Sequence, residues 1–176
     1  MRDAMARVMQ GWALSLRGAG HEALTHLSAA VKDYRATGAR AWQTYFLALL
    51  ARAYCNAGLV TEGLQTVGEA CGLSMNQAEH WWDAELSRIE GDLHVASSGS
   101  QDARAEECYR NAIETALRQQ ARSWELRAAT SLARLLGNQG RRAEAHELLA
   151  PIYGWFTEGF DTADLKEAKA LLAELM

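Results

Sequence analysis

The sequence predicts an all-α protein, an α-α superhelix of four helix pairs with a C-terminal capping helix. Three observations predict it: a composition rich in alanine and leucine with one proline, a helix–turn–helix pattern that recurs about every 40 residues, and an amphipathic last segment. Alanine and leucine are strong helix formers. A helix pair that cannot cover its own apolar face is stabilised by stacking on its neighbours, so a tandem array buries one continuous core.

We predict a single helical-repeat domain over residues 1–176. A chain of this length is that of one ordinary domain and is long enough to bury a core. The four units and the cap are expected at roughly residues 1–35, 41–75, 81–120, 123–156 and 161–176.

The second helix of each unit carries the clearest repeat. A small residue recurs in the stretches HEALTHLSAAV, TEGLQTVGEAC, RAEECYRNAI and AEAHELLAPI, at Ala23, Gly63, Ala105 and Ala145. These positions are 40, 42 and 40 residues apart. An apolar or aromatic residue follows four positions later, and another follows three beyond that. This spacing of i, i+4 and i+7 predicts one face of an amphipathic helix.

The first helix of each unit is marked by tryptophan and by a second small residue nine positions later. The pairs are Trp42 with Ala51, Trp82 with Gly91 and Trp124 with Ala133. The first unit lacks this tryptophan, and we place its small residue at Ala13. We expect the tryptophans to be buried in the packing, at about 150–250 Å² each. A ligand cage is the alternative use of such a stripe.

A glycine-containing turn joins the two helices of each unit, in RGAGHE, CNAGLV, SSGSQD and GNQGRR. Glycine suits a helix end that requires a left-handed residue. The third turn is longer and rich in serine, so we expect it to be the most flexible.

This tandem pattern resembles the tetratricopeptide repeat, in a variant longer than the usual length of about 34 residues. The resemblance implies an interaction module that binds extended segments along a concave surface lined by the first helices. It also implies five surface positions per unit, at offsets −6, −3, +1, +4 and +5 from the small residue. At about 100° per residue, these positions fall within one arc of the helix.

Applied to this chain, the offsets predict an arginine-lined concave groove. Its residues of interest are Arg7, Arg17, Tyr45, Arg52, Asn56, Glu85, Arg88, Asp92, Arg127, Arg134 and Asn138. Arginine offers a planar fork that binds carboxylate or phosphate through paired hydrogen bonds. The groove is therefore predicted to accept an acidic peptide, a C-terminal carboxylate or the acidic face of a partner domain. The alternative is that these arginines only solubilise the helices and pair with nearby glutamates.

A second resemblance is densest in roughly the last 70 residues, from AEECYRNAIETALRQQ through SWELRAATSLARLLGNQG to DTADLKEAKALLAEL. These repeats look like the C-terminal repeats of large bacterial signalling proteins, in which an adenylate or guanylate cyclase-like domain and a predicted ATPase domain come first. The sequence holds no cyclase segment and no phosphate loop G-x-x-x-x-G-K-[ST], so the enzymatic activities do not carry over. A cyclase or ATPase domain, of the same or another chain, is the partner that this resemblance implies.

The segment YGWFTEGFDTADL, followed by KEAKALLAEL, predicts the end of the array. An apolar face on the last helix would shield the final pair, as solenoids require. That face consists of Leu165, Ala168, Leu171, Leu172 and Leu175. Asp161 or Thr162 can accept hydrogen bonds from the first amides of this helix. A ligand-binding loop is the alternative interpretation of the segment.

Four aromatic side chains precede the cap and are expected to pack beneath it: Tyr153, Trp155, Phe156 and Phe160. Pro151 falls inside the second helix of the fourth unit, where a proline removes a backbone hydrogen bond. We therefore expect that helix to kink or to end close to Pro151.

Residues with reactive chemistry do not form a recognisable motif. The five histidines include no HExxH and no i, i+4 pair, and no G-x-S-x-G elbow occurs. Glu90 and His94 share a helix face, whereas Asp92 points away from it. We interpret this group as a solvated helix face, because two ligands do not make a metal site. The sequence predicts no enzyme, no cofactor and no metal.

Bulk properties restrict location and partners. The net charge of −4 argues against a protein that coats nucleic acid. Cys55, Cys71 and Cys108 form no CxxC pair, so we expect reduced, mostly buried thiols. The N-terminal stretch lacks a signal-peptide core, and the longest apolar run, YFLALLA, is too short to span a membrane. We predict a cytoplasmic protein without a membrane partner.

Homodimerisation is the alternative function. The first unit begins at Met1 without its tryptophan, and an open first pair would expose Met5, Val8 and Met9 to a second copy. Small-molecule or nucleotide sensing by the arginines is a third hypothesis.

Overall fold

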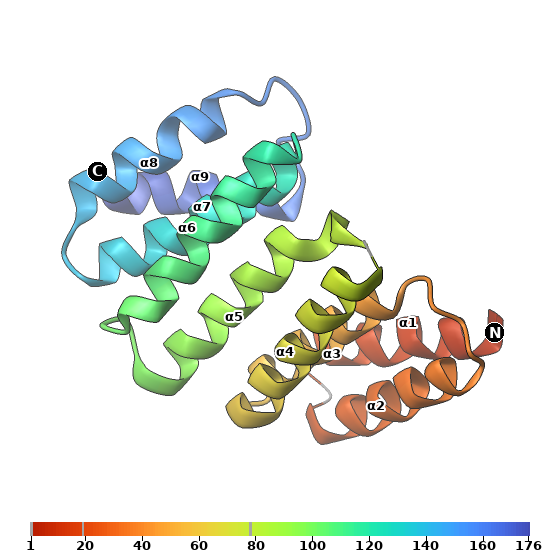
Figure 1. Ribbon diagram of the computed structural model, residues 1–176. Helices are drawn as coiled ribbons and strands as arrows, with labels where there is room; N and C mark the ends of the chain where they lie inside the picture. The colour runs from red at the N-terminus through yellow and green to blue at the C-terminus, as the bar shows by residue number, and fades with distance from the viewer. Residues whose placement is uncertain (1, 19, 78) are drawn as a thin grey trace. The chain divides into compact units, whose positions relative to one another are not determined.

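The computed structural model describes residues 2–18, 20–77 and 79–176 (Figure 1). Met1, where the first unit is predicted to begin, and Ala19, in the first turn, lie outside these ranges. The described residues form helices and no strand, which confirms the all-α prediction. None of their helices is both long and apolar enough to cross a membrane.

In chain order the helices are α1 (Arg2–Leu16), α2 (Gly20–Ala36), α3 (Gln43–Asn56), α4 (Val60–Gln77), the short 3-10 helix η1 (His80–Trp82), α5 (Asp83–Ser98), α6 (Ala103–Arg118), α7 (Arg122–Asn138), α8 (Arg142–Gly154) and α9 (Ala163–Leu175).

The helices form two compact units, Met1–Trp82 and Asp83–Met176, and each is described by itself. We call them the N-terminal unit and the C-terminal unit. The single domain over residues 1–176 stays a prediction.

In the N-terminal unit, α1 packs on α2 and α3 packs on α4, and both helices of the first pair also contact α3. This is the stacking of helix pairs that an α-α superhelix requires. Tyr34 connects the pairs: its ring meets Phe46 edge to face at 4.7 Å, and its hydroxyl donates to the carbonyl of Ala41 at 2.7 Å. Burial raises the pKa of Tyr34, with the nearby charge of Glu79 as a second cause.

Val8 is fully buried in this unit, although we expected it to be exposed. Met5 and Met9 are half-buried. The expectation fails because α1 lies against both α2 and α3, which cover the side of α1 that Val8 occupies. The open apolar face on which the homodimer hypothesis rested is therefore not present at Val8.

In the C-terminal unit, α5 packs on α6, α7 packs on α8, and each first helix also contacts the next, so that α5 meets α7 and α7 meets α9. One apolar core runs through the unit. Its largest fully buried side chains within the helices of the second pair are Leu126, Leu132, Leu136 and Leu149.

Gly11, not Ala13, is the small residue of the first unit. Ala13 is exposed, whereas Gly11 is buried and faces the backbone of Leu27 on α2. A Cβ atom on Gly11 would lie 2.9 Å from both the N and the Cα atoms of Leu27. Gly91 has the same role on α5, where a Cβ atom would lie 2.5 Å from the ring of Tyr109. The corrected series restores a spacing of 40 residues between the first two units.

Replacing Gly11 with alanine is expected to lower the free energy of unfolding by about 1–3 kcal/mol, because the added methyl group overpacks a backbone contact. The loss should appear although alanine favours a helix by about 1 kcal/mol over glycine. Urea denaturation followed by circular dichroism measures it. Gly68→Ala is the matched control, since Gly68 lies in α4 and no atom comes within 4 Å of the position that a Cβ atom would take there. An alanine at Gly11 that stabilises as much as one at Gly68 would contradict the close contact.

Helix α9 is the predicted C-terminal helix, and it contacts both α7 and α8. Four of the five residues assigned to its apolar face are buried: Leu165, Ala168, Leu171 and Leu175. Pro151 lies inside α8, which ends three residues later at Gly154, close to the predicted stop.

The loop before α9 differs from its prediction. Trp155 and Phe160 are 56% and 48% exposed, so they are not packed beneath the cap, whereas Tyr153 and Phe156 are half-buried against the core. Thr162 is the N-cap residue of α9, but its side chain accepts no hydrogen bond from the helix. The hydroxyl of Thr162 instead donates to the carbonyl of Gly159 at 2.7 Å, and this bond holds the turn.

Candidate interaction surface

The predicted groove positions differ in exposure according to their offset. Counted from Gly11, Ala51, Gly91 and Ala133, all four residues at offset −3 are buried: Val8, Ala48, Arg88 and Thr130. All four at offset +5 are exposed: Leu16, Asn56, Ala96 and Asn138. Offset −3 therefore belongs to the packing of the first helices, and a ligand can meet only the other positions. With Gly11 as the reference, Arg7 and Arg17 no longer fall on the predicted offsets.

Arg88 is the one charged residue among these buried positions, and it is 4% exposed. Its guanidinium donates to both carboxylate oxygens of Glu85, at 2.9 and 2.8 Å, and to Asp92 at 2.6 Å. The other oxygen of Asp92 accepts from the hydroxyl of Tyr109 at 2.8 Å. The two carboxylates raise the pKa of Arg88 against the opposing effect of burial, so Arg88 is always charged.

The other two predicted groove arginines of the C-terminal unit, Arg127 and Arg134, are paired as well. Arg127 lies 2.8 Å from Glu85 and 3.8 Å from Asp164 of α9, and its guanidinium lies over the ring of Trp124. Arg134 pairs with Glu167 of α9 at 2.9 Å. Sequence reasoning counted Glu85 as a groove position but missed Asp164 and Glu167, because these two acids come from α9, a helix outside the counted offsets. In this unit, the arginines are neutralised by their neighbours, as the alternative interpretation proposed.

In the N-terminal unit, Arg7 pairs with Asp33 of α2 at 2.8 Å, and Arg17 is exposed after the end of α1. Arg52 lies on α3, seven residues after Tyr45 and therefore on the same side of the helix. Asn56 is exposed one turn further on. Tyr45, Arg52 and Asn56 thus lie along α3 as the part of the predicted groove that belongs to the second helix pair.

The tryptophans are more exposed than predicted. Among the three in the repeat pattern, Trp42 is 42% exposed, and Trp82 and Trp124 are half-buried. The reason is their position at the very start of the first helices: Trp42 precedes α3, Trp82 precedes α5, and Trp124 lies in the first turn of α7. A residue at the helix end is only partly covered by the neighbouring helices.

Four aromatic side chains of the N-terminal unit form one cluster, which we call the aromatic patch: Trp42, Tyr45, Trp81 and Trp82. Trp42 and Trp81 meet edge to face at 5.2 Å, and Tyr45 stacks on Trp82 at 4.5 Å. The hydroxyl of Tyr45 reaches the sulfur of Met9 on α1 at 3.8 Å. Burial raises the pKa of Tyr45. Trp81 is 42% exposed, as is Trp42, so the patch presents two large aromatic rings to solvent beside the half-buried Tyr45 and Trp82.

The backbone conformation of Trp42 is strained. Its φ angle is 67°, in the left-handed region that side chains other than glycine, asparagine and aspartate rarely adopt. Its amide donates to a carboxylate oxygen of Glu79 at 3.0 Å, and its carbonyl accepts from Phe46 in the first turn of α3. A strained non-glycine residue costs about 1–3 kcal/mol and persists only where its surroundings enforce it.

Comparisons with known proteins agree with this architecture. No protein-family model matches the sequence, and no curated protein sequence is similar to it. The crystal structure of nearly identical TPR-like repeats of a putative kinesin light chain from Podosopora anserina superposes with a TM-score of 0.69. A variant of that protein gives a TM-score of 0.70. Both are 20% identical to this chain over 97% of its length and 84% of theirs. The chain therefore has the fold of tetratricopeptide-like repeat proteins, an α-α superhelix.

Proposed function

We propose that this protein is a non-catalytic protein-interaction scaffold that binds an extended peptide along α3, from the aromatic patch to Arg52. The exposed aromatic patch is the observation that carries the proposal. Tryptophan and tyrosine are enriched at the centres of protein interfaces, because they bury a large area with few rotatable bonds. The strained backbone at Trp42 fixes one of these rings before any ligand arrives, and this lowers the entropy cost of binding.

Charge favours an acidic ligand on this unit. The N-terminal unit contains seven lysines and arginines and six acidic residues, whereas the C-terminal unit contains eleven and sixteen. Tyr45 and Arg52 are two helical turns apart, or about 10 Å. A peptide in the extended polyproline II conformation covers that distance in about three residues, at about 3.1 Å each, and its three residues per turn bring side chains three positions apart to the same face. The ligand that fits is a segment with an apolar side chain and a carboxylate three positions apart.

The thiol of Cys108 does not have the environment of a catalytic nucleophile. The pKa of Cys108 is raised to about 12 by burial, with Glu90, Glu107 and Asp102 as further causes, whereas a nucleophilic cysteine needs a lowered pKa.

The resemblance to repeat regions of bacterial cyclase and ATPase proteins makes an acidic segment of such a domain a candidate ligand. A role in cytoplasmic signalling would follow from that partner.

Peptide selection tests the proposal directly. A displayed library of random peptides is selected on the purified full chain, and enriched peptides are measured by isothermal titration calorimetry. We expect them to carry an acidic residue near an aromatic or aliphatic one. Trp42→Asn combined with Trp81→Ala should weaken their binding at least about tenfold, the effect of losing an interface hot spot. Asparagine is chosen at Trp42 because it tolerates the left-handed backbone.

Two matched controls locate the site. Trp155→Ala removes another exposed tryptophan, in the C-terminal unit, and should leave affinity unchanged. Arg52→Glu should weaken the binding of acidic peptides, whereas Arg134→Glu, which makes the same change on α7 of the other unit, should not. If enriched peptides bind the double tryptophan variant as well as the original protein, the patch is not the binding site. Enrichment of no peptide would count against the scaffold function itself.

A further inference from the structure

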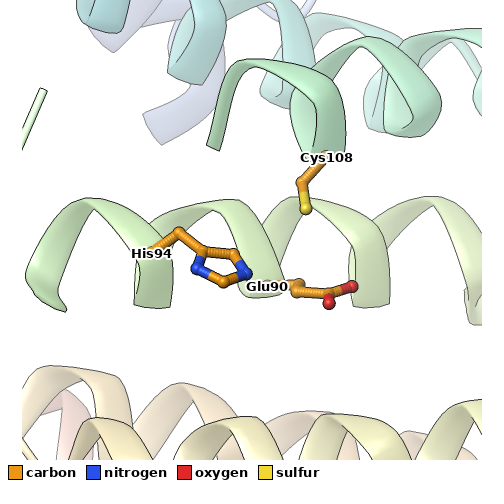
Figure 2. Close-up of side chains that lie close together, drawn as sticks. All are labelled: Glu90, His94 and Cys108. Atoms are coloured by element: carbon orange, nitrogen blue, oxygen red, sulfur yellow. The ribbon is translucent and has the colours of Figure 1, made fainter. Parts of the chain in front are cut away.

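Glu90, His94 and Cys108 lie together in the C-terminal unit, at the packed pair α5 and α6 (Figure 2). Each side chain offers one metal-ligand atom, and these three atoms all lie within 4.8 Å of one another. Figure 2 shows the imidazole of His94 extending along α5 toward Glu90, with the sulfur of Cys108 reaching down from α6. The sequence interpretation of Glu90 and His94 as a solvated face does not hold for His94, which is 9% exposed.

The fold brings these residues together by two separate devices. Glu90 and His94 are four residues apart on α5, so they share one face of the helix. Gly91 has no side chain, and Tyr109 therefore packs closely against its backbone. This contact places the preceding residue of each helix, Glu90 and Cys108, beside each other. Reading α5 alone could find two ligands, and only the pairing with α6 supplies the third.

Asp102, which precedes α6, lies behind His94. One carboxylate oxygen of Asp102 lies 3.6 Å from Nδ1 of His94, and it is buried without a hydrogen-bond partner among the described residues. The other oxygen accepts from the amide of Arg104 and caps α6. A carboxylate at Nδ1 of histidine is the usual outer partner of a metal-binding imidazole, because it orients the ring and leaves Nε2 for the metal.

We propose that Glu90, His94 and Cys108 form a binding site for a divalent transition metal of the Zn²⁺ class, with Asp102 orienting His94. Thiolate, imidazole and carboxylate are the three ligand types that Zn²⁺ takes in proteins. Three protein ligands leave the fourth tetrahedral position open to water or to a partner's side chain. This proposal is independent of the peptide-binding function, which is placed on the other unit.

The geometry requires only small side-chain movements. Zinc bonds of about 2.0–2.3 Å place tetrahedral ligand atoms about 3.3–3.8 Å apart. The ligand atoms here already lie within 4.8 Å, so rotation of the Glu90 and Cys108 side chains is sufficient. Glu90 and Cys108 are half-buried, which leaves an entry path for the ion.

The electrostatic environment also favours a cation. Three acidic side chains, Glu90, Glu107 and Asp102, lie around Cys108 against one nearby cation, Arg104. This excess of negative charge favours a divalent ion. Binding would then displace the thiol proton, because only the thiolate is a ligand.

Cobalt titration of the full chain, prepared without a histidine tag, tests the site. Co²⁺ replaces Zn²⁺ in such sites, and a thiolate ligand gives it a charge-transfer absorption band. We expect one Co²⁺ per chain with this band, which Zn²⁺ should then displace. Calorimetry of Zn²⁺ binding at neutral pH, in two buffers of different ionisation enthalpy, should report the release of about one proton from the thiol.

Variants assign the ligands. Cys108→Ser should abolish the charge-transfer band, and His94→Gln should weaken Co²⁺ binding more than tenfold. Asp102→Asn can keep the cap of α6 and should weaken binding by about 10- to 100-fold, the usual effect of losing an outer carboxylate. Cys71→Ser is the matched control, because Cys71 is equally half-buried but lies in α4 of the other unit. Circular dichroism confirms that each variant is folded.

The same measurements can overturn the proposal. A cobalt complex without a thiolate band, or a band that persists in Cys108→Ser, would exclude Cys108 as a ligand. Equal Zn²⁺ affinity in the original protein and in His94→Gln would mean that the ion binds elsewhere on the surface. Absence of any binding by folded protein would exclude the site altogether.

Discussion

Val8→Asp is expected to unfold the N-terminal unit. Val8 is fully buried between α1 and the helices α2 and α3, so the carboxylate would have no water and no partner. Burial of an unpaired charge, together with the lost apolar contacts, should cost more than about 4 kcal/mol, which few single substitutions reach. Marginal stability of about 5–15 kcal/mol leaves little after such a loss. Circular dichroism and urea denaturation should report lost helix and a strongly lowered midpoint.

Gln10→Asp is the matched control for Val8→Asp. It adds the same charge to the same helix two residues later, at an exposed position, and should change stability by less than about 0.5 kcal/mol. Light scattering adds a second readout. If Val8 were a dimer contact on an open face, Val8→Asp would give a folded monomer; a buried Val8 predicts unfolded or aggregated chains instead. A folded, monomeric Val8→Asp protein would contradict the packing of α1.

Much of the fold was predictable because equivalent residues recur at a nearly constant spacing, which aligns the helix pairs with one another. The recurrence of small residues predicted the helix pairs, and the apolar spacing of the last segment predicted the face of α9, of which Leu172 alone is not fully buried. The first unit was misread at one point, where Ala13 was chosen over Gly11. The choice of Gly11 would have kept the spacing of 40 residues, but it would have placed Val8 at offset −3, which was predicted to line the groove. The structure shows that residues at this offset are buried between helices, and the spacing along one helix does not reveal this.

The chemistry was less predictable because it depends on contacts between helices. Offsets along one helix identified Arg134 but could not show that Glu167 of α9 would neutralise it. They also identified Glu85 and Arg88, which pair within α5, but not the burial of that pair. The same limit applied to Cys108, which reaches Glu90 only across the pair α5 and α6. One signal was available: if Gly91 packs against Tyr109, the preceding residues of the two helices are also neighbours. The predicted burial of the tryptophans was wrong for another reason. The repeat spacing alone does not show whether a residue lies at the end of a helix or in its middle.

Arg88→Met is expected to lower the free energy of unfolding by about 3–5 kcal/mol. Arg88 occupies a position where Val8, Ala48 and Thr130 stand in the other units, so a buried charge there needs its partners. Removing the guanidinium deprives Glu85, which is also 4% exposed, of the two hydrogen bonds that it accepts from Arg88. The cost is the weaker compensation of a buried carboxylate in a low dielectric, and urea denaturation measures it.

Arg134→Met is the control, because its pair with Glu167 is about half exposed on both sides and should contribute less than about 1 kcal/mol.

A second variant separates the effect of the buried charge from that of side-chain packing. Replacing both Glu85 by leucine and Arg88 by methionine removes the ion pair without leaving either charge alone, and should recover most of the loss. Salt should weaken the Arg134 pair and leave the Arg88 pair nearly unchanged, since buried pairs are screened much less. If Arg88→Met costs no more than Arg134→Met, the buried ion pair does not stabilise the C-terminal unit.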